Sequence, residues 1–348
     1  MPEPTSPLGK PRVLIPAPSE SRHAHLAWPK LAITSKGSLV LAYSAGQFHG
    51  SHGGGCPAVS VSTDNGTTFG EPQILTEFSD ADTYTNCGNL AIGVTKEDVV
   101  VLIAMAYRGN EANSIFGWAS VDAGQRWQEI NVSSLAAGRT GSVYGHIFHV
   151  SDRGYAVCGH YRAGSFPNET GLWISFSRDA LHWGPPEHIS DAALVEPAVV
   201  SLEEDIVGLV RNQDPARHSG YALLRANRRR MDWSLSESPI RAAISTYRLP
   251  SPFITTDPDD PSKLIALMTE RTEPGNTPGR ISLWTSESAG TDWTSHGTLI
   301  DFPHEQDNLN IDFGYPWMVK RKGGKWLMAF YYGQQKGPNS IWGLDLEI

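Results

Sequence analysis

The sequence predicts an all-β chain folded as a six-bladed β-propeller of four-stranded antiparallel blades. Three observations carry this prediction: short apolar runs bounded by turn residues dominate the chain, no amphipathic helix of three turns is visible, and one turn motif recurs at near-constant spacing. Repeated units of about 40–50 residues are typical of propellers. We therefore expect residues 1–348 to form a single domain.

Short apolar runs separated by turn residues are typical of β-strands. The clearest runs are Ser38–Tyr43, Ala58–Ser62, Val99–Ala106, Tyr155–Gly159, Gly171–Phe176 and Leu264–Met268. The chain also contains 34 glycines and 24 prolines, a composition that favours many tight turns and few helices.

The recurring turn motif has the form Ser-x-Asp-x-Gly-x-x-aromatic. Ser62–Phe69 is the first copy, Ser120–Trp127 repeats it 58 residues later, and Ser177–Trp183 follows 57 residues further on, shortened by one residue and without the glycine. Ser286–Trp293 is a fourth copy, with Ser288 in the Asp position. Three good copies at this spacing indicate a repeat architecture rather than an isolated turn.

Each copy follows an apolar strand, so we expect it to form the outer hairpin turn of one blade. In such a turn the Asp accepts backbone N–H bonds, the Gly takes a conformation unfavourable to other residues, and the aromatic side chain is buried beneath the loop. We therefore expect the three Asp residues to be structural rather than catalytic: Asp64, Asp122 and Asp179.

Two further segments bring the number of repeats to six. Arg225–Trp233 lies where a degenerate copy of the motif is expected, and Gly314–Ile348 forms a C-terminal unit. We expect the N-terminal strand near Arg12–Ile15 to complete the last blade and close the ring.

Composition argues against several functional classes. The formal net charge of −9 disfavours nucleic acid as a partner, because nucleic acid is held by clustered Lys and Arg. Cys56, Cys87 and Cys158 suggest neither a disulfide framework nor a zinc site, and none of the twelve histidines has HxxxH or HExxH spacing, so we expect no metal or cofactor.

The sequence shows no targeting segment or membrane span. Met1–Lys10 lacks the apolar core of a signal peptide, and no apolar stretch approaches the roughly 18–20 residues that cross a bilayer. A reducing, cytoplasmic compartment is favoured by the cysteine content. The sequence leaves the oligomeric state open.

The turn motifs resemble the Asp-boxes of the sialidase (neuraminidase) superfamily, and the resemblance extends over nearly the whole chain. Glu196–Val200 followed by Asp205–Arg211 is similar to the family's Glu-Pro segment leading to an arginine. Arg280–Trp284 resembles the strand with another family arginine. Gly314–Trp317, followed by Phe330–Tyr332, resembles the final-blade segment with the nucleophilic tyrosine.

This resemblance implies a retaining glycoside hydrolase that removes a terminal anionic sugar, as an exo-α-sialidase does. Tyr315 would attack the sugar and Glu196 would take the tyrosine's proton. Arg211 and Arg280 would hold the substrate's anionic group, which suits the planar fork of guanidinium. A neutral phenol is a suitable nucleophile because the carboxylate beside the anomeric carbon repels a negatively charged nucleophile.

The first blade departs from the family pattern. His25–Ala45 resembles that blade, but Leu26–Pro29 lacks the family's first arginine, and Arg22 would reach the site only if a loop brought it back. Tyr332 stands where the acidic residue that braces this arginine is expected. The two losses are consistent with each other, because a buried charge without a partner is costly.

The catalytic acid also differs. Gly46–Cys56 contains no carboxylate but two histidines, His49 and His52, and a histidine is a suitable proton donor near neutral pH. Further candidates flank apolar strands and are expected to face inward: Tyr144, His146, His160 and Asp312.

Three functions from different classes remain open on the sequence. The first is the glycoside hydrolase. The second is a polysaccharide lyase on uronic-acid glycans, with His49 or His52 and Tyr315 as acid and base. The third is a non-catalytic carbohydrate-binding propeller whose tryptophans stack on sugars. The expected partner is in each case an anionic glycan.

Overall fold

A computed structural model describes residues 3–19, 21–50, 52–136, 141–162, 170–213, 220–242, 249–272, 276–302 and 311–348 of the chain. Within these ranges the secondary structure consists of 24 β-strands and one short 3-10 helix, Ser133–Ala136, and no α-helix is present. None of these residues forms a helix of the length and apolarity needed to span a bilayer. The all-β prediction is confirmed.

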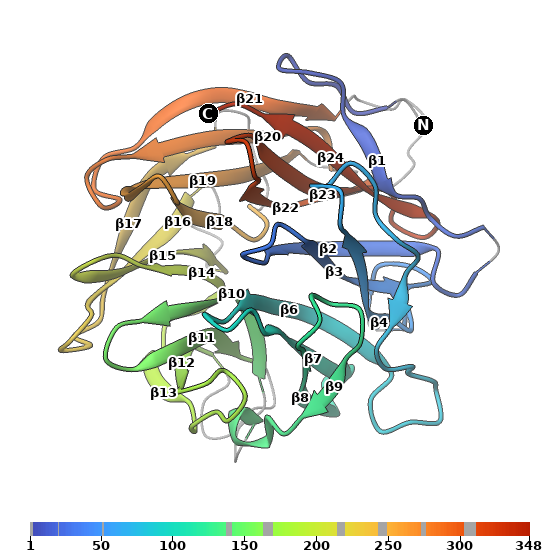
Figure 1. Ribbon diagram of the computed structural model, residues 1–348, viewed down its shortest axis with the longest axis horizontal. Helices are drawn as coiled ribbons and strands as arrows, with labels where there is room; N and C mark the ends of the chain where they lie inside the picture. The colour runs from blue at the N-terminus through green and yellow to red at the C-terminus, as the bar shows by residue number, and fades with distance from the viewer. Residues whose placement is uncertain are drawn as a thin grey trace.

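The strands pair antiparallel with their neighbours in the chain, four to a group (Figure 1). The first group consists of β2 (His25–Ile33), β3 (Leu39–Gly46), β4 (Cys56–Ser62) and β5 (Gln73–Ile74). The second group consists of β6 (Asn86–Val94), β7 (Val100–Arg108), β8 (Ala112–Ser120) and β9 (Gln128–Ile130). The next two are β10 (Gly141–Val150), β11 (Gly154–Tyr161), β12 (Leu172–Ser177), β13 (Glu187–Ser190), and β14 (Leu194–Ser201), β15 (Asp205–Asn212), β16 (Gly220–Asn227), β17 (Ser234–Arg241).

The C-terminal third of the chain continues the pattern. It contributes β18 (Phe253–Asp257), β19 (Asp260–Thr272), β20 (Asn276–Ser286), β21 (Thr294–Phe302), and then β22 (Ile311–Lys320), β23 (Trp326–Gln334), β24 (Asn339–Leu346). The N-terminal strand β1 (Arg12–Ile15) pairs antiparallel with β24, with Arg12 opposite Gly343. The predicted pairing of the first strand with the last unit is therefore confirmed.

Parallel contacts join some groups into larger sheets. β2 meets β24 at His25 and Asn339, and β10 meets β6 at Gly145 and Ala91. The result is two eight-stranded and two four-stranded sheets. Figure 1 shows the groups arranged around a common centre, with the first strand of each nearest to it: β2, β6, β10, β14, β18 and β22.

The repeated turn motifs join the third and fourth strands of their groups, away from this centre. In the first copy Gly66 N–H donates to Ser62 Oγ at 2.8 Å, and Thr68 N–H donates to Asp64 Oδ1 at 3.0 Å. Gly66 has a φ of 81°, a left-handed conformation that favours glycine. Hydrogen bonds from Thr68 and Ser62 lower the pKa of Asp64 to about 2. The Asp64 carboxylate therefore stabilises the turn in which it lies.

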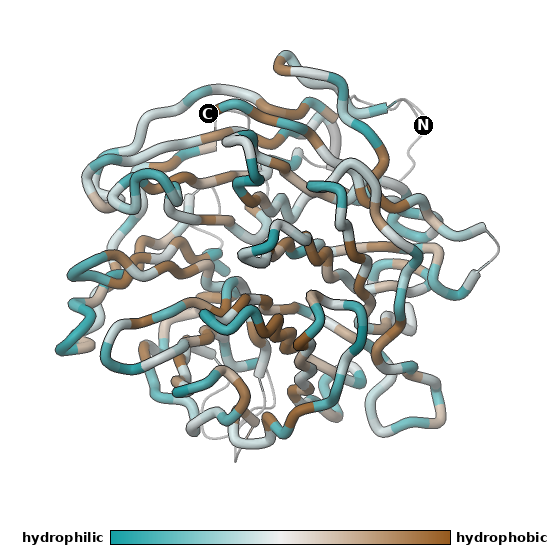
Figure 2. Tube along the Cα trace, in the orientation of Figure 1, coloured by the Kyte–Doolittle hydropathy of each residue, from teal (hydrophilic) through white to brown (hydrophobic). Residues whose placement is uncertain are grey.

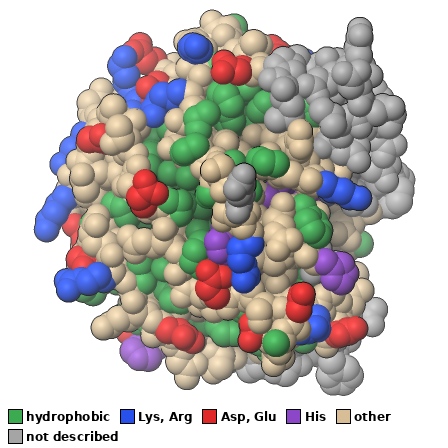
Figure 3. Space-filling model, turned by 90° about the vertical axis from the view of Figure 1, so that its right-hand side faces the viewer, with side chains coloured by type: hydrophobic (Ala, Val, Ile, Leu, Met, Phe, Trp, Pro, Cys, Tyr) green, Lys and Arg blue, Asp and Glu red, His purple; other side chains and the backbone are tan. Residues whose placement is uncertain are grey.

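Apolar side chains fill the space between the sheets. Figure 2 shows hydrophobic residues along the strands and hydrophilic ones mainly in the connecting loops. The core contains large aromatic side chains that are fully buried, among them Trp173, Trp317 and Trp326. On the face shown in Figure 3, acidic and basic side chains are interspersed. The three cysteines are free and buried.

Candidate functional site

The innermost strands β2, β6, β10, β14 and β22 each contain a register shift, and in three of them a non-glycine residue with a positive φ lies at the shift. The register shifts within β2, β14 and β22. At these shifts Trp28, Glu196 and Tyr315 have φ values of 56°, 57° and 50°. Each is followed by a proline, which has no N–H for the ladder: Pro29, Pro197 and Pro316. Bulges re-aim side chains, and left-handed non-glycine residues concentrate at functional sites.

Glu196 and Tyr315 meet at the centre of the molecule. The Tyr315 hydroxyl donates to Glu196 Oε1 at 3.0 Å. Arg211 Nη1 donates to Glu196 Oε2 at 2.8 Å and lies 3.4 Å from the Tyr315 oxygen. Ser251 Oγ donates to Oε2 at 2.5 Å, and Asn89 Nδ2 to Oε1 at 3.4 Å. The structure therefore brings together three residues singled out in the sequence.

The environment assigns opposite protonation states to these two residues. Burial opposes ionisation of Glu196, but the charge of Arg211 and hydrogen bonds from Ser251 and Arg211 outweigh it and lower the Glu196 pKa to about 2. Burial, together with the charge of Glu196, raises the pKa of Tyr315 to about 12. At neutral pH an ionised carboxylate thus accepts a hydrogen bond from a neutral phenol.

His160 supports the backbone of Glu196. The Glu196 N–H donates to His160 Nδ1 at 3.1 Å, so this nitrogen carries a lone pair. Burial lowers the His160 pKa to about 4, which keeps the ring neutral and able to accept this bond. His160 acts on the site through Glu196.

Arg280 lies in a neighbouring ion pair. Its Nε and Nη2 donate to Glu270 Oε1 and Oε2 at 2.9 and 3.1 Å, and the Glu270 side chain is buried. Burial raises the pKa of the Tyr221 phenol, the charge of Arg211 lowers this pKa, and the charge of Glu270 raises it. Tyr221 is therefore close enough to both Arg211 and Glu270 to be affected by their charges.

A second cluster is centred on Asp312, which lies on the same strand as Tyr315. His49 Nδ1 lies 2.5 Å from Asp312 Oδ2, and His25 Nε2 lies 3.5 Å from it. The Tyr331 hydroxyl donates to Asp312 Oδ1 at 2.8 Å, and Arg271 Nη2 lies 3.5 Å from that oxygen. Burial opposes ionisation of Asp312, but the His49 charge and hydrogen bonds from His25 and His49 hold its pKa well below the usual range.

Of the two loop histidines, the structure brings only His49 to the centre. Its ring packs edge-on against Trp28 at 5.3 Å, and Trp28 lies 6.3 Å from the Tyr315 ring. The His49 side chain is 31% exposed, so it can meet a ligand. His52 is exposed and makes no hydrogen bond or ion pair with a described residue.

Arg22 does not join the Glu196 cluster. Its guanidinium donates to the Phe78 carbonyl and lies 3.5 Å from Glu77 Oε2, in the connection after β5. The side chain is 43% exposed. The loop before β2 therefore holds Arg22 against this connection and does not bring it to the position of the missing arginine.

Tyr144 lies beneath the site rather than in it. It is buried, and its hydroxyl donates to the Pro252 carbonyl at 3.0 Å. His146 is also turned away: its Nε2 lies 3.0 Å from the Ile254 carbonyl, and burial lowers its pKa to about 4. His146 lines a different cavity of about 260 Å³, which also involves Lys320.

Sequence reasoning missed Lys30. This lysine is fully buried two residues after Trp28, and its Nζ has no hydrogen-bond partner among the described residues. The ammonium lies 4.3 Å and 4.4 Å from the ring centroids of Trp317 and Tyr144, and 5.9 Å from that of Tyr315. Burial lowers its pKa to about 7, against an opposing effect of the Glu196 charge. The sequence signal that could have identified Lys30 is the presence of a lysine within an apolar run.

Sequence reasoning also missed Arg271. Arg271 Nη2 donates to the Phe313 carbonyl and to the Tyr331 hydroxyl. Tyr332, which occupies the sequence position of the lost bracing acid, stacks on Phe302 at 5.4 Å. Successive side chains of a strand point to opposite faces, so Tyr331 meets the arginine and Tyr332 does not.

A metal ion fits the Asp312 cluster poorly. The ligand atoms of His25, His49 and Asp312 lie within 4.8 Å of one another, as do those of a second set, His23, Cys56 and Glu77. However, the 2.5 Å between His49 and Asp312 is a hydrogen-bond distance, and Arg271 already places a cation beside this carboxylate. The set of His25, His49 and Asp312 is therefore better suited to a hydrogen-bonded proton than to a metal ion.

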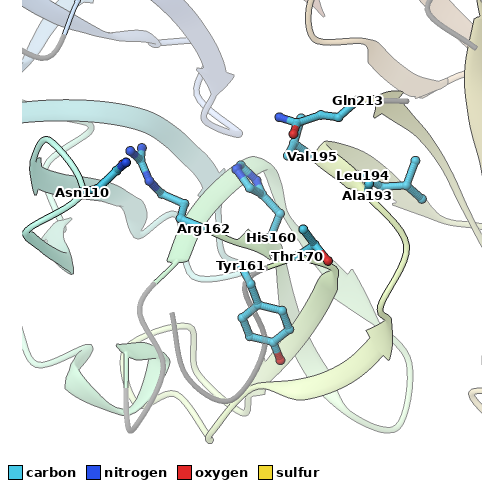
Figure 4. A pocket seen from close by; sticks show the side chains of 9 residues that line it. All are labelled: Asn110, His160, Tyr161, Arg162, Thr170, Ala193, Leu194, Val195 and Gln213. Atoms are coloured by element: carbon cyan, nitrogen blue, oxygen red, sulfur yellow. The ribbon is translucent and has the colours of Figure 1, made fainter. Parts of the chain in front are cut away.

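A pocket of about 370 Å³ opens beside the Glu196 cluster (Figure 4). Its described lining consists of Asn110, His160, Tyr161, Arg162, Thr170, Ala193, Leu194, Val195 and Gln213. His160, which supports Glu196, forms part of its wall.

Comparison with solved structures identifies the fold. A protein of unknown function from Dyadobacter fermentans matches with a TM-score of 0.74 and 16% identity over 100% of both chains. The NanB sialidase of Streptococcus pneumoniae matches with a TM-score of 0.72 and 14% identity, covering 97% of this chain and 70% of that one. The Hadza microbial sialidase Hz136 matches with a TM-score of 0.68 and 16% identity, covering 97% and 68%.

No profile of a known protein family matches the chain, and no curated protein matches it. The structural matches show that the chain has a sialidase-like β-propeller fold. Identities this low establish the fold and not the activity.

Proposed function

We propose that the protein is a glycoside hydrolase that removes a terminal anionic sugar with retention of configuration, and that its chain forms one six-bladed propeller domain. The observation that carries the proposal is the hydrogen bond of 3.0 Å from the Tyr315 hydroxyl to Glu196 Oε1, with Arg211 bound to the same carboxylate. A nucleophile held by its own base is the arrangement that covalent catalysis requires.

In the first step the Tyr315 oxygen bonds to the anomeric carbon while its proton passes to Glu196. The phenol has a pKa of about 12 and the carboxyl one of about 2, so a free phenolate is strongly disfavoured. The proton therefore moves as the oxygen–carbon bond forms. In the second step water attacks the sugar, the bond to Tyr315 breaks, and Glu196 returns the proton.

His49 supplies the proton for the leaving group in this scheme. Its Nδ1 bonds Asp312, which fixes the ring and leaves Nε2 as the proton donor. The glycosidic carbon–oxygen bond breaks as this proton reaches the leaving oxygen. His49 then takes a proton from the attacking water, which restores the starting state.

Arg211 and Arg280 account for the preference for an anion. Each is held in place by a buried carboxylate, Glu196 or Glu270, and guanidinium has five N–H donors, more than these contacts use. Arg271 is directed to the Phe313 carbonyl and to Tyr331, so we assign it to bracing β22.

The test is turnover of a panel of aryl sialosides and aryl uronides. We expect release of the aryl group from at least one anionic glycoside, and a loss of at least about 10³-fold in kcat for Tyr315→Phe. Tyr332→Phe is the matched control, because Tyr332 stacks on Phe302 away from Glu196. Absence of turnover on the whole panel, or full activity of Tyr315→Phe, would reject the proposal. Growth of enone absorbance during the reaction would indicate a lyase instead.

A further inference from the structure

Three side chains of metal-binding type meet beside the first group of strands. His23 precedes β2, Cys56 begins β4, and Glu77 follows β5. One nitrogen, one sulfur and one oxygen atom from these side chains lie within 4.8 Å of one another. Because the three residues come from separate segments of the chain, no short spacing motif marks them in the sequence. The proposed mechanism uses none of them.

The separations within this cluster are close to those between the ligands of one zinc ion. His23 Nε2 lies 3.1 Å from Glu77 Oε1, and Cys56 Sγ lies 3.6 Å from Glu77 Oε2. Zinc bonds of about 2.0 Å to nitrogen and oxygen and about 2.3 Å to sulfur, at tetrahedral angles, place neighbouring ligand atoms roughly 3.3–3.5 Å apart. The Glu77 side chain is 57% exposed, so its carboxylate is free to adjust to an ion.

His23 has the orientation of a metal ligand. Its Nδ1 lies 3.2 Å from the Ala45 carbonyl, which can only accept a hydrogen bond, so this nitrogen carries a proton. In the neutral ring Nε2 then has a lone pair, and at 3.1 Å it faces a Glu77 oxygen that is also an acceptor. Such a contact needs a cation, which is either a second ring proton or a metal ion. Metal-bound histidines usually donate their other ring N–H to a carbonyl or carboxylate in this way.

Cys56 supplies the sulfur ligand. Its side chain is fully buried, and Sγ accepts a hydrogen bond from the Phe78 N–H at 3.3 Å. Burial raises the pKa of the free thiol to about 11, but a divalent ion deprotonates the thiol that binds it. The Phe78 N–H would then stabilise the thiolate. A thiolate with an imidazole favours zinc, whereas calcium and magnesium prefer sites made of oxygen atoms.

Arg22 does not exclude a divalent cation from this cluster. Its Nη2 donates to the Phe78 carbonyl, and its contacts with Glu77 Oε2 and Cys56 Sγ are longer, at 3.5 and 3.9 Å. A thiolate and a carboxylate together bring two negative charges, which match the charge of a zinc ion. The Asp312 cluster offers one carboxylate and two histidines, so a neighbouring arginine offsets its only negative charge.

We propose that His23, Cys56 and Glu77 form a zinc site with three protein ligands and one open position. The ion joins the segment before β2 to the start of β4 and to the connection after β5. It thereby fixes the Cys56 end of the loop Gly46–Cys56, which carries His49. Because the Glu77 side chain is exposed, water can take the fourth position. The site does not depend on hydrolase activity.

The test is metal binding by the full chain after dialysis against a chelator. Isothermal titration calorimetry with zinc chloride should show one tight binding event, and Co²⁺ should give the near-ultraviolet absorption of a cobalt–thiolate bond. We expect His23→Gln to weaken zinc binding by at least about 100-fold, because even the partners behind metal ligands contribute about 10–100-fold. Saturating zinc should raise the melting temperature of the parent and not that of His23→Gln.

Matched substitutions separate this site from general effects on the chain. Cys56→Ala should abolish the cobalt–thiolate absorption, whereas Cys158→Ala, at another buried free cysteine, should retain it. His188→Gln on β13 is the control for His23→Gln and should bind zinc as the parent does. Should Cys56→Ala fail to fold, Glu77→Gln at an exposed side chain gives the same comparison of zinc affinity.

Three results would overturn the zinc site. They are the absence of zinc binding by the parent, an unchanged zinc affinity in His23→Gln and Cys56→Ala, and tighter binding of Ca²⁺ than of Zn²⁺. The site and the hydrolase are tested separately. Zinc binding that depends on His23, with no turnover of any glycoside, keeps the site and rejects the hydrolase, and turnover without zinc binding does the reverse.

Discussion

Tyr315 on β22 and Glu196 on β14 are 119 positions apart in the chain and share a hydrogen bond of 3.0 Å. Both residues sit at a β-bulge, have a positive φ, and precede a proline. The same local feature, a bulged residue with a positive φ before a proline, therefore positions both the nucleophile and its base, which come from two separate groups of strands.

We expect the fold to be destabilised when the buried ion pair between Glu196 and Arg211 is broken on one side. Glu196→Gln removes the negative charge and leaves the buried Arg211 cation without its partner, and loss of one member of a buried pair costs about 3–5 kcal/mol. We expect a decrease of this size in the free energy of unfolding, measured by urea denaturation at pH 7. The double variant Glu196→Gln/Arg211→Met should recover part of it. A single variant as stable as the parent would contradict the pairing.

Lys30 makes stability depend on pH above neutrality. Its pKa is about 7 in the folded chain and 10.5 when unperturbed, so between these values the unfolded state binds more protons than the folded one. Stability therefore rises with pH across this window, by up to about 5 kcal/mol at 1.36 kcal/mol per pKa unit.

Lys30→Met should remove this rise and stabilise the chain below pH 7, because methionine carries no buried charge. Thermal or urea unfolding at pH 6, 8 and 9.5 provides the measurement. Lys36→Met, at an exposed lysine, is the control. An identical pH slope in parent and Lys30→Met would show that this ammonium is not desolvated.

We expect the effect of the His49–Asp312 pair on kcat to depend on the leaving group of the substrate. Asp312→Asn removes the anion that orients His49, so we expect kcat on a methyl glycoside to fall by about 10²-fold or more. A nitrophenyl glycoside needs little protonation and should be much less affected. His49→Gln should behave similarly and His52→Gln should not. Equal losses on both leaving groups would mean that the pair has only a structural role.

Arg271 and Tyr331 brace the strand that carries Tyr315. Tyr331→Phe removes a hydroxyl that contacts both Arg271 and Asp312, so we expect lower stability by about 1–2 kcal/mol. Tyr332→Phe, which alters the opposite face of the strand, should not weaken this contact. Differential scanning calorimetry of both variants is the test, and an unchanged melting temperature for Tyr331→Phe would argue against the brace.

Much of the fold follows from local sequence signals. Apolar runs bounded by turn residues predicted strands that are present, and the Ser–Asp–Gly motif predicted a turn whose hydrogen bonds are observed. Glu196, Arg211 and Tyr315 were identified by resemblance and lie together.

What the sequence did not reveal depends on radial geometry and on register. Ser251 and Lys30 reach Glu196 and its neighbours only because separate strands converge on one centre, which no local pattern encodes. The choice between Tyr331 and Tyr332 depends on strand parity, and a one-residue change of register exchanges the faces. Arg271 is separated from the apolar run Leu264–Met268 by Thr269 and Glu270, whereas Arg211 directly follows Val210, so the same signal did not mark Arg271.

The nucleophile assignment is tested most directly by trapping the sugar on the enzyme. The unmodified chain is incubated with a slow anionic fluoroglycoside, quenched in acid, digested and analysed by peptide mass spectrometry. A covalent sugar on the Tyr315 oxygen, absent in Tyr315→Phe, is the predicted result. Steady turnover of anionic glycosides with no adduct at Tyr315, or with the adduct on another side chain, would contradict it.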